Sequence, residues 1–252
     1  MTRTAFYAAA LCCSLVACST NQPGSTPPPG TITTTMPSGG VYKGSLKGST
    51  MDATLLMLFD GTAYLFYGSA SGTNLAGVAV ATNGAQTSDG RFASNNALDY
   101  RVGAAPAKPV TFIANFAHAP SVTGAVVNKD GSPDLEYGVA AAPMLDIAPS
   151  QANAGGLYSG RGMALGGVTE TRITVAGDGY LAGTTTSGCI FKGTVAAHPG
   201  TNAYDVSVTF GPAPCPLPDA TVKGNAVLDG PRLLVALPSP DRSNVFLFDG
   251  RK

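Results

Sequence analysis

The sequence predicts an all-β protein built from two tandem small antiparallel lobes, each a β-barrel or a meander sandwich, that arose from an internal duplication. Short runs of alternating or β-branched residues recur along the chain, and Asp-Gly turn signals separate them. No segment of ten or more residues carries a helical stripe with caps. The 32 glycines would weaken a helix wherever one began.

The composition of the chain excludes one class of function before any motif is considered. The chain has 252 residues, a length that accommodates two small domains. Its 15 Lys and Arg balance 15 Asp and Glu, whereas nucleic-acid binding needs clustered positive charge to contact phosphates. The sequence therefore excludes a nucleic-acid partner, and it spells out no ligand or reaction.

Residues 1–17 are predicted to be a signal peptide. Arg3 supplies the basic start, and an apolar run from Ala5 to Ala17 follows. That run is shorter than the roughly 20 residues a membrane-spanning helix needs. An ordinary secretory signal that happens to end near a cysteine is the alternative.

Leu15-Val16-Ala17-Cys18 resembles the lipobox of bacterial lipoproteins, in which an aliphatic and two small residues precede the lipidated cysteine. Neither Cys12 nor Cys13 follows two small residues. The resemblance implies lipidation of Cys18, and thus an anchor in the membrane. Ser19, where inner-membrane lipoproteins carry Asp, implies the outer membrane. The residues do not tell whether the body faces the periplasm or the cell exterior.

Residues 18–38 are predicted to be a tether rich in Pro, Ser and Thr. The segment from Ser19 to Ser38 carries five prolines and no charged residue, so it buries little apolar surface. Its Pro27-Pro28-Pro29 run favours extended polyproline II. A proline-recognition ligand is the alternative, because such segments dock into aromatic grooves.

Beyond Gly39 the strand pattern begins. The predicted strands include Thr54 to Phe59, Ala63 to Tyr67, Leu75 to Ala81, Val110 to Phe116, Val122 to Val127, Arg172 to Ala176, Ala203 to Phe210 and Val245 to Phe248. Asp-Gly pairs occur at Asp60, Asp89, Asp130, Asp178, Asp229 and Asp249, with Asn83-Gly84 as a seventh turn signal. Such pairs supply positive φ in two-residue hairpin loops, so all are predicted to be hairpin turns.

Four echoes in the same order indicate the duplication. Gly39 to Gly44 is matched by Gly155 to Gly160, Asp60-Gly61 by Asp178-Gly179, Leu75 to Val78 by Ile190 to Val195, and Val122 to Gly124 by Val222 to Gly224. The predicted lobes are residues 39–145 and 155–252, and the boundary lies within 140–154. Glycines at Gly77, Gly124, Gly193 and Gly224 are predicted to mark bends or close backbone approaches within strands.

In overall plan, the lipobox, the low-complexity tether and the Gly-rich β lobes resemble the two-lobed surface lipoproteins of Gram-negative bacteria, the transferrin-binding and complement-factor-binding kinds. No binding motif of those families can be matched residue by residue. The resemblance therefore implies an architecture and no ligand.

One disulfide is predicted, between Cys189 and Cys215. These are the two cysteines that remain after processing once Cys18 carries lipid, and the compartment is oxidising. A redox pair or a metal site is the alternative, although thiolate metal sites use more than two ligands.

No catalytic or metal-binding constellation is present in the sequence. His118 and His198 are isolated beside proline-containing turns, and there is no G-x-S-x-G elbow and no spaced acidic calcium loop. We therefore expect no enzyme activity, no cofactor and no metal.

Tyr64 and Phe66 form a candidate binding patch. They lie on one face of a strand, where Phe59 can join them across the hairpin. Core filling is the alternative interpretation of the same residues. An exposed recognition patch would support contact with a partner.

These observations favour a non-catalytic interaction module anchored to the outer membrane, with a protein partner at the envelope or host surface. A lipocalin-like carrier that holds an apolar small molecule inside one lobe is the alternative. A hydrolase is a third possibility that no motif supports.

Overall fold

The computed structural model describes residues 33–69, 74–142 and 148–252, and these belong to one compact unit. The first half contains β1 (Thr34–Thr35), β2 (Gly40–Leu46), β3 (Met51–Met57), β4 (Ala63–Ser69), β5 (Leu75–Thr82), β6 (Ala85–Thr87), β7 (Arg91–Arg101), β8 (Lys108–Asn115), β9 (Ser121–Val127) and β10 (Pro133–Ala141). The second half contains α1 (Gln151–Ala154), β11 (Gly156–Ala164), β12 (Gly167–Val175), β13 (Tyr180–Thr185), β14 (Ile190–Ala197), β15 (Tyr204–Phe210), β16 (Thr221–Asp229), β17 (Arg232–Pro238) and β18 (Val245–Arg251).

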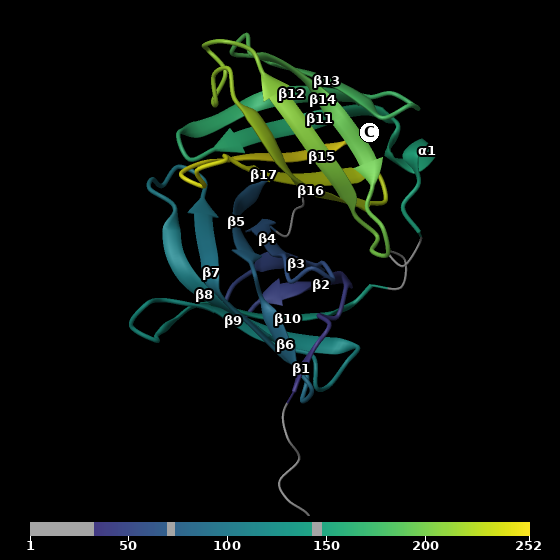
Figure 1. The fold of residues 1–252 in the computed structure, drawn as a ribbon. Coiled ribbons are helices and arrows are strands. Elements are labelled where there is room, and N and C mark those ends of the chain that lie inside the picture. The colour runs from purple at the N-terminus through teal and green to yellow at the C-terminus, as the bar shows by residue number, and fades with distance from the viewer. Residues whose placement is uncertain (1–32, 70–73, 143–147) are drawn as a thin grey trace, which may run out of the picture. The chain divides into compact units, whose positions relative to one another are not determined.

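The strands close into two antiparallel barrels in tandem, which confirms the predicted fold class (Figure 1). The first barrel runs β2-β3-β4-β5-β7-β8-β9-β10, and β10 pairs back onto β2. The second barrel runs from β11 to β18 in sequence order, and β18 pairs back onto β11. Closure leaves no free edge within either ring.

Buried side chains fill the inside of each barrel. In the first barrel the rings of Phe92 and Phe112 meet edge to face, with centroids 6.2 Å apart. In the second barrel Phe191, Phe210 and Phe246 form a triangle of rings whose centroids lie 5.3, 5.6 and 5.1 Å apart. Aromatic rings in mutual contact make these interiors packed cores.

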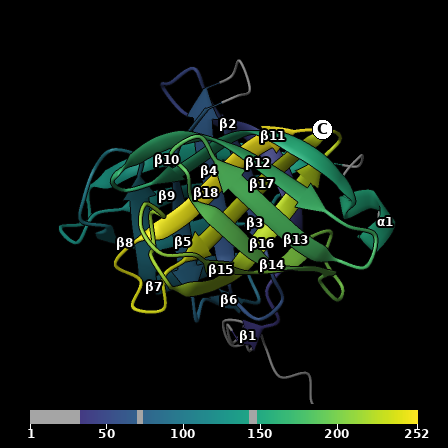
Figure 2. The same cartoon turned by 90° about the horizontal axis from the view of Figure 1, so that it is seen from above.

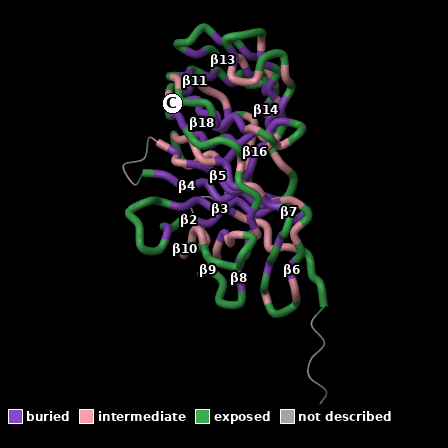
Figure 3. The backbone as a smooth tube through the Cα atoms, turned by 90° about the vertical axis from the view of Figure 1, so that its left-hand side faces the viewer, coloured by how far each residue is buried: buried purple, intermediate pink, exposed green. Residues whose placement is uncertain are grey.

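A third hydrophobic core joins the two barrels. It contains Val41, Leu56, Leu58, Tyr64, Phe66, Leu75, Val78, Val80 and Tyr100 from the first barrel, and Met163, Leu165, Ala203, Val227, Leu234, Ala236, Val245 and Leu247 from the second. These side chains point outward from their own barrels, because alternate residues of a strand face opposite sides. Figure 3 shows the resulting zone of buried backbone, where β3, β4 and β5 lie beside β16 and β18.

Polar contacts cross the same junction. The Lys43 Nζ lies 2.6 Å from the Asp229 Oδ2, and the Tyr100 hydroxyl donates to the Arg242 carbonyl oxygen over 3.0 Å. Arg242 in turn donates from Nη1 to the Asn96 Oδ1 over 2.6 Å. The barrels therefore share both an apolar core and a hydrogen-bonded rim.

The Asp-Gly turns differ from the prediction in two ways. Around Asp60, Asp130 and Asp178 the loop has three residues, in which the glycine takes a positive φ and the aspartate Oδ1 accepts from the amide two residues on. These are hairpins, but their loops are one residue longer than predicted. Asp249-Gly250 is not a turn at all, because it lies inside β18. The prediction of a hairpin there was wrong.

Three of the four sequence echoes occupy equivalent places in the two barrels. The first echo begins the first strand of each barrel, where Gly40 and Gly156 take φ values of 152° and 147°, a region that side chains rarely adopt. The second lies in the turn between second and third strands, and the third lies on the fourth strand. The fourth echo pairs β9, the seventh strand of its barrel, with β16, the sixth of its own. These two segments are therefore not equivalent.

The chain enters the first barrel through an added pair of strands. β1, formed by the last part of the predicted tether, pairs with β6, and β6 pairs with β7. The amide of Ser38 donates to the Gln86 Oε1 over 2.8 Å, which fixes the chain as it approaches β2. In Figure 1, β1 lies at the end of the first barrel opposite the second barrel. None of the described helices is long and apolar enough to cross a membrane.

Candidate functional site

Tyr64 and Phe66, the candidate patch, lie buried between the barrels. Their rings stack with centroids 6.1 Å apart, and both belong to the core that joins the barrels. The Tyr64 hydroxyl donates to the Asn225 Oδ1 over 2.9 Å. Burial raises the pKa of Tyr64, and the charge of Asp60 raises it further, so the phenol stays protonated as a donor. An exposed patch at these two residues is therefore wrong, because the second barrel covers them.

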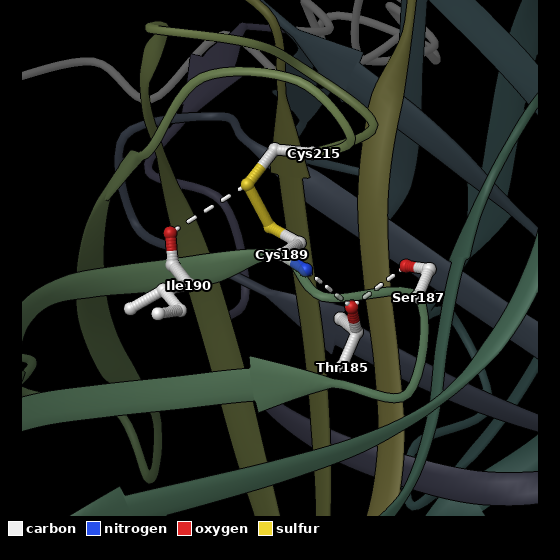
Figure 4. The surroundings of a disulfide bond; sticks show 5 residues. All are labelled: Thr185, Ser187, Cys189, Ile190 and Cys215. Carbon is white, nitrogen blue, oxygen red and sulfur yellow. Dashed lines mark hydrogen bonds between the residues drawn. A yellow bond between two sulfur atoms is a disulfide. The ribbon is translucent and has the colours of Figure 1, made fainter.

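Cys18, the predicted lipidation site, lies outside the described residues, as does the whole predicted signal peptide. The disulfide between Cys189 and Cys215 is present, with Cα atoms 4.5 Å apart (Figure 4). It fastens the loop between β15 and β16 to the start of β14. The Cys189 amide donates to the Thr185 Oγ1, and the Cys215 sulfur lies 3.5 Å from the Ile190 carbonyl oxygen. Both cysteines are buried.

Replacing both Cys189 and Cys215 by alanine is expected to cost about 3 kcal/mol of unfolding free energy. The bond spans 26 residues of sequence, and its loss frees that loop in the unfolded chain. Urea unfolding of the full chain measures the effect, with the wild-type protein under reducing conditions as the matched comparison. A loss below about 1 kcal/mol would show that the loop is held by its packing alone.

A histidine–aspartate pair that the sequence did not reveal lies at the edge of the second barrel. His198 Nδ1 is 2.8 Å from the Asp205 Oδ1, which also accepts from the Asn225 Nδ2 over 2.8 Å. Asn225 continues the chain to Tyr64. This chain of side chains contains no serine, threonine or cysteine, so it lacks the nucleophile of a catalytic triad. These hydrogen bonds connect the second barrel to Tyr64 of the first, which is a structural role.

A hollow of about 890 Å³ lies beside α1 and the end of β16. Its charged groups are engaged with neighbouring groups. Lys43 pairs with Asp229, and the Lys252 Nζ donates to the carbonyl oxygens of Asn153 and Gly155 over 2.8 and 3.1 Å. The first contact joins the two barrels, and the second holds the segment before β11 against the end of the second barrel, so both have a structural role.

A second hollow, of about 670 Å³, runs over the outer faces of β11 to β15 on the second barrel. We call it the lateral groove, and its lining includes Leu157, Arg172, Tyr180, Thr184, Ile190 and Lys192. Seen from above in Figure 2, β12, β13 and β14 lie in front of the strands of the first barrel. The core that joins the barrels takes its second-barrel residues mainly from β16, β17 and β18. The groove therefore occupies the opposite wall.

Three large apolar side chains are exposed in the lateral groove. Leu157 is 56% exposed, Tyr180 51% and Ile190 68%. They come from β11, β13 and β14, and the pairing of these strands through β12 brings them onto one face. Apolar side chains clustered on a surface and surrounded by polar ones are typical of interaction sites.

The lateral groove is also positively charged. Arg172 lies directly across from Thr184, and Thr184 lies across from Ile190, while Lys192 lies across from Ala182. Neither Arg172 nor Lys192 pairs with a carboxylate within the described ranges, and none of the described residues that line the groove is acidic. The groove thus combines apolar anchors with two unneutralised cations.

The same face of the first barrel is covered by protein. The repeated motif aligns Val41 with Leu157, and the strand pairings extend each into a row across the outer face. The rows read Val41, Leu56, Tyr64 and Val80 in the first barrel, and Leu157, Thr174, Ala182 and Lys192 in the second. The first row is buried against the second barrel, whereas the second row is half polar and lies in the groove.

Within the described part of the chain, no group of three or more His, Cys, Asp or Glu side chains is placed to hold a metal ion. No protein-family model matches the sequence, and no curated protein matches it. Among solved structures, one of the matches is a crystal structure of a mutant of the vaccine antigen transferrin-binding protein B from Haemophilus parasuis Hp5. The match covers 81% of this chain and 66% of that one, slightly less than two thirds of its length, at 8% identity and a TM-score of 0.27. The groove's own geometry therefore carries the functional inference.

Proposed function

We propose that this chain is a lipid-anchored binding protein of the bacterial outer membrane, and that the lateral groove of its second barrel is the binding surface. One observation carries the proposal. The face of the first barrel that corresponds to the groove is a buried protein interface, whereas the groove itself is open and keeps exposed apolar residues such as Leu157 and Ile190. A half-polar face is the composition of interfaces that form and separate.

The predicted anchor is consistent with this role. Lipid on Cys18 and an extended tether would hold the body at a distance from the membrane. The described chain starts near β1, at the end of the first barrel opposite the second barrel (Figure 1). A binding face on the second barrel would then lie far from the point where the described chain enters the first barrel.

The interiors of the barrels do not support the carrier alternative. Aromatic side chains such as Phe112 and Phe246 occupy the space that an apolar ligand would need. The exposed concave surface lies instead on the outside of the second barrel. We therefore propose no small-molecule transport.

Site-specific photo-crosslinking in intact cells tests the proposed function. A photoreactive phenylalanine replaces Ile190 in the full chain, and the matched control carries it at Val168, which is 50% exposed on the same barrel but outside the groove's lining. We expect a discrete adduct from Ile190 and none from Val168. The Cys18→Ala variant is expected to lose membrane retention and the adduct together. Equal adducts from the two positions, or none from Ile190, would overturn the proposal.

A further inference from the structure

We propose that the lateral groove takes an acidic, partly apolar segment of a partner protein. This inference rests on the proposed function, and it specifies the chemistry of the partner. Its basis is the unneutralised pair of Arg172 and Lys192 among exposed apolar side chains.

The positive charge of the groove favours a partner segment with negative charge. The whole chain is balanced at 15 positive and 15 negative side chains, so the positive charge of this face is a local feature and does not reflect the net charge of the chain. Two other exposed cations of the chain have carboxylate partners, since Lys43 pairs with Asp229 and Arg161 with Glu170. Arg172 and Lys192 have none within the described residues. Carboxylates of a bound segment would supply the missing partners and set the orientation of binding.

The apolar residues require that the segment also carry hydrophobic side chains. Leu157, Tyr180 and Ile190 would each be covered by a partner that lies across β11 to β14. Thr174 and Thr184 present hydroxyl groups between them, which can donate to carboxylates or accept from amides. A segment that alternates acidic and apolar residues satisfies all three kinds of group at once.

The corresponding face of the first barrel indicates that the occupant of the lateral groove is a protein, and not a nucleic acid or a lipid surface. There the corresponding residues Val41, Leu56 and Tyr64 are buried against strands of the second barrel. Two cations on a groove with three large apolar side chains are also too few to hold a phosphate backbone. The structure therefore favours a polypeptide over a nucleic acid or a lipid surface.

Peptide binding to the full chain in detergent tests the inference. The probes are three fluorescein-labelled peptides of twelve residues in which Val alternates with Glu, Gln or Lys. We expect the Glu peptide to bind most tightly, and its affinity to fall at least about tenfold in the Arg172→Glu, Lys192→Glu double variant. Added salt should weaken the wild-type interaction and leave the variant nearly unchanged.

A matched variant separates local charge from net charge. Lys129→Glu with Lys223→Glu changes the total charge by the same amount at exposed positions outside the groove's lining. We expect this variant to bind the Glu peptide like the wild-type chain. Equal weakening in both double variants, or equal binding of the Glu and Lys peptides, would overturn the inference.

The other occupants are separate outcomes. Phosphatidylglycerol vesicles or a single-stranded oligonucleotide that binds through the same two cations, more tightly than the Glu peptide, would overturn the inference. So would a dimer of the full chain that dissociates in the Arg172→Glu, Lys192→Glu variant, because the occupant would then be a second copy. If the Ile190 crosslinker captures a partner segment without excess Asp or Glu, the acidic inference fails while the proposed function stands.

Discussion

Replacing Asp249 by alanine is expected to lower the unfolding free energy by about 3–5 kcal/mol. Its side chain is 1% exposed and accepts two parallel hydrogen bonds, from Arg232 Nε over 2.8 Å and from Arg232 Nη2 over 2.7 Å. Burial alone would lower the pKa of Arg232, but the bonds to Asp249 and the nearby charges of Asp229 and Asp52 raise it overall. Because an arginine side chain keeps its proton at any ordinary pH, the guanidinium stays charged when Asp249 is removed. An unpaired buried charge is the costly state.

Two further variants test this explanation. Glu170→Ala removes the exposed partner of Arg161, whose Nε lies 3.4 Å from the Glu170 Oε1, and should cost less than about 1 kcal/mol. Replacing the buried pair together, with Arg232→Met and Asp249→Leu, should recover most of the loss, because no charge is then left without a partner. Urea unfolding at fixed ionic strength measures all three. If Asp249→Ala costs no more than Glu170→Ala, water must reach Arg232 in the folded state.

Asp249 also shows how far local sequence signals extend. Asp-Gly pairs at Asp60, Asp130 and Asp178 form hairpins, because the strands on either side end there and the glycine can take positive φ. Asp249-Gly250 is the same dipeptide, but Arg232 on the neighbouring strand β17 donates to the Asp249 carboxylate and makes its burial favourable. A long-range partner thus decides between turn and strand. The sequence of the dipeptide alone does not predict which distant residue will contact it.

Strand prediction succeeded where apolar and β-branched residues alternate, as in β4, β9 and β15. β7 contains Asn95-Asn96, and β11 contains three glycines, so neither shows a strong strand signal of its own. Both become strands because closing the ring requires a partner on each side. The number of lobes was therefore predictable, whereas the full set of strands depended on tertiary pairing.

The candidate site was the least predictable feature. Cysteine counting gave the disulfide, since only two thiols remained to pair. Tyr64 and Phe66 were identified as one face of a strand, but the sequence could not tell that another barrel covers that face. Leu157 and Ile190 lie on strands that are not adjacent, and the register of the pairings from β11 through β12 and β13 to β14 places them in one groove. Exposure is a property of the assembled fold, so its prediction required the structure.

Replacing Phe66 by alanine is expected to cost about 3–5 kcal/mol and to loosen the contact between the barrels. The ring is 1% exposed, stacks on Tyr64, and belongs to the core that both barrels share. A cavity there removes contacts from the second barrel as well as the first. Hydrogen exchange should therefore become faster in β16 to β18, more than 150 residues away in sequence.

Phe92→Ala is the matched control, because Phe92 is equally buried but lies inside the first barrel. It should lower stability by a similar amount, since the same atoms are removed from a packed site. Its effect on exchange should be concentrated in the first barrel, because its contacts stay within that ring. Faster exchange in β16 to β18 only in Phe66→Ala would establish that the shared core couples the barrels. Identical exchange patterns in the two variants would show instead that each barrel is held by its own interior.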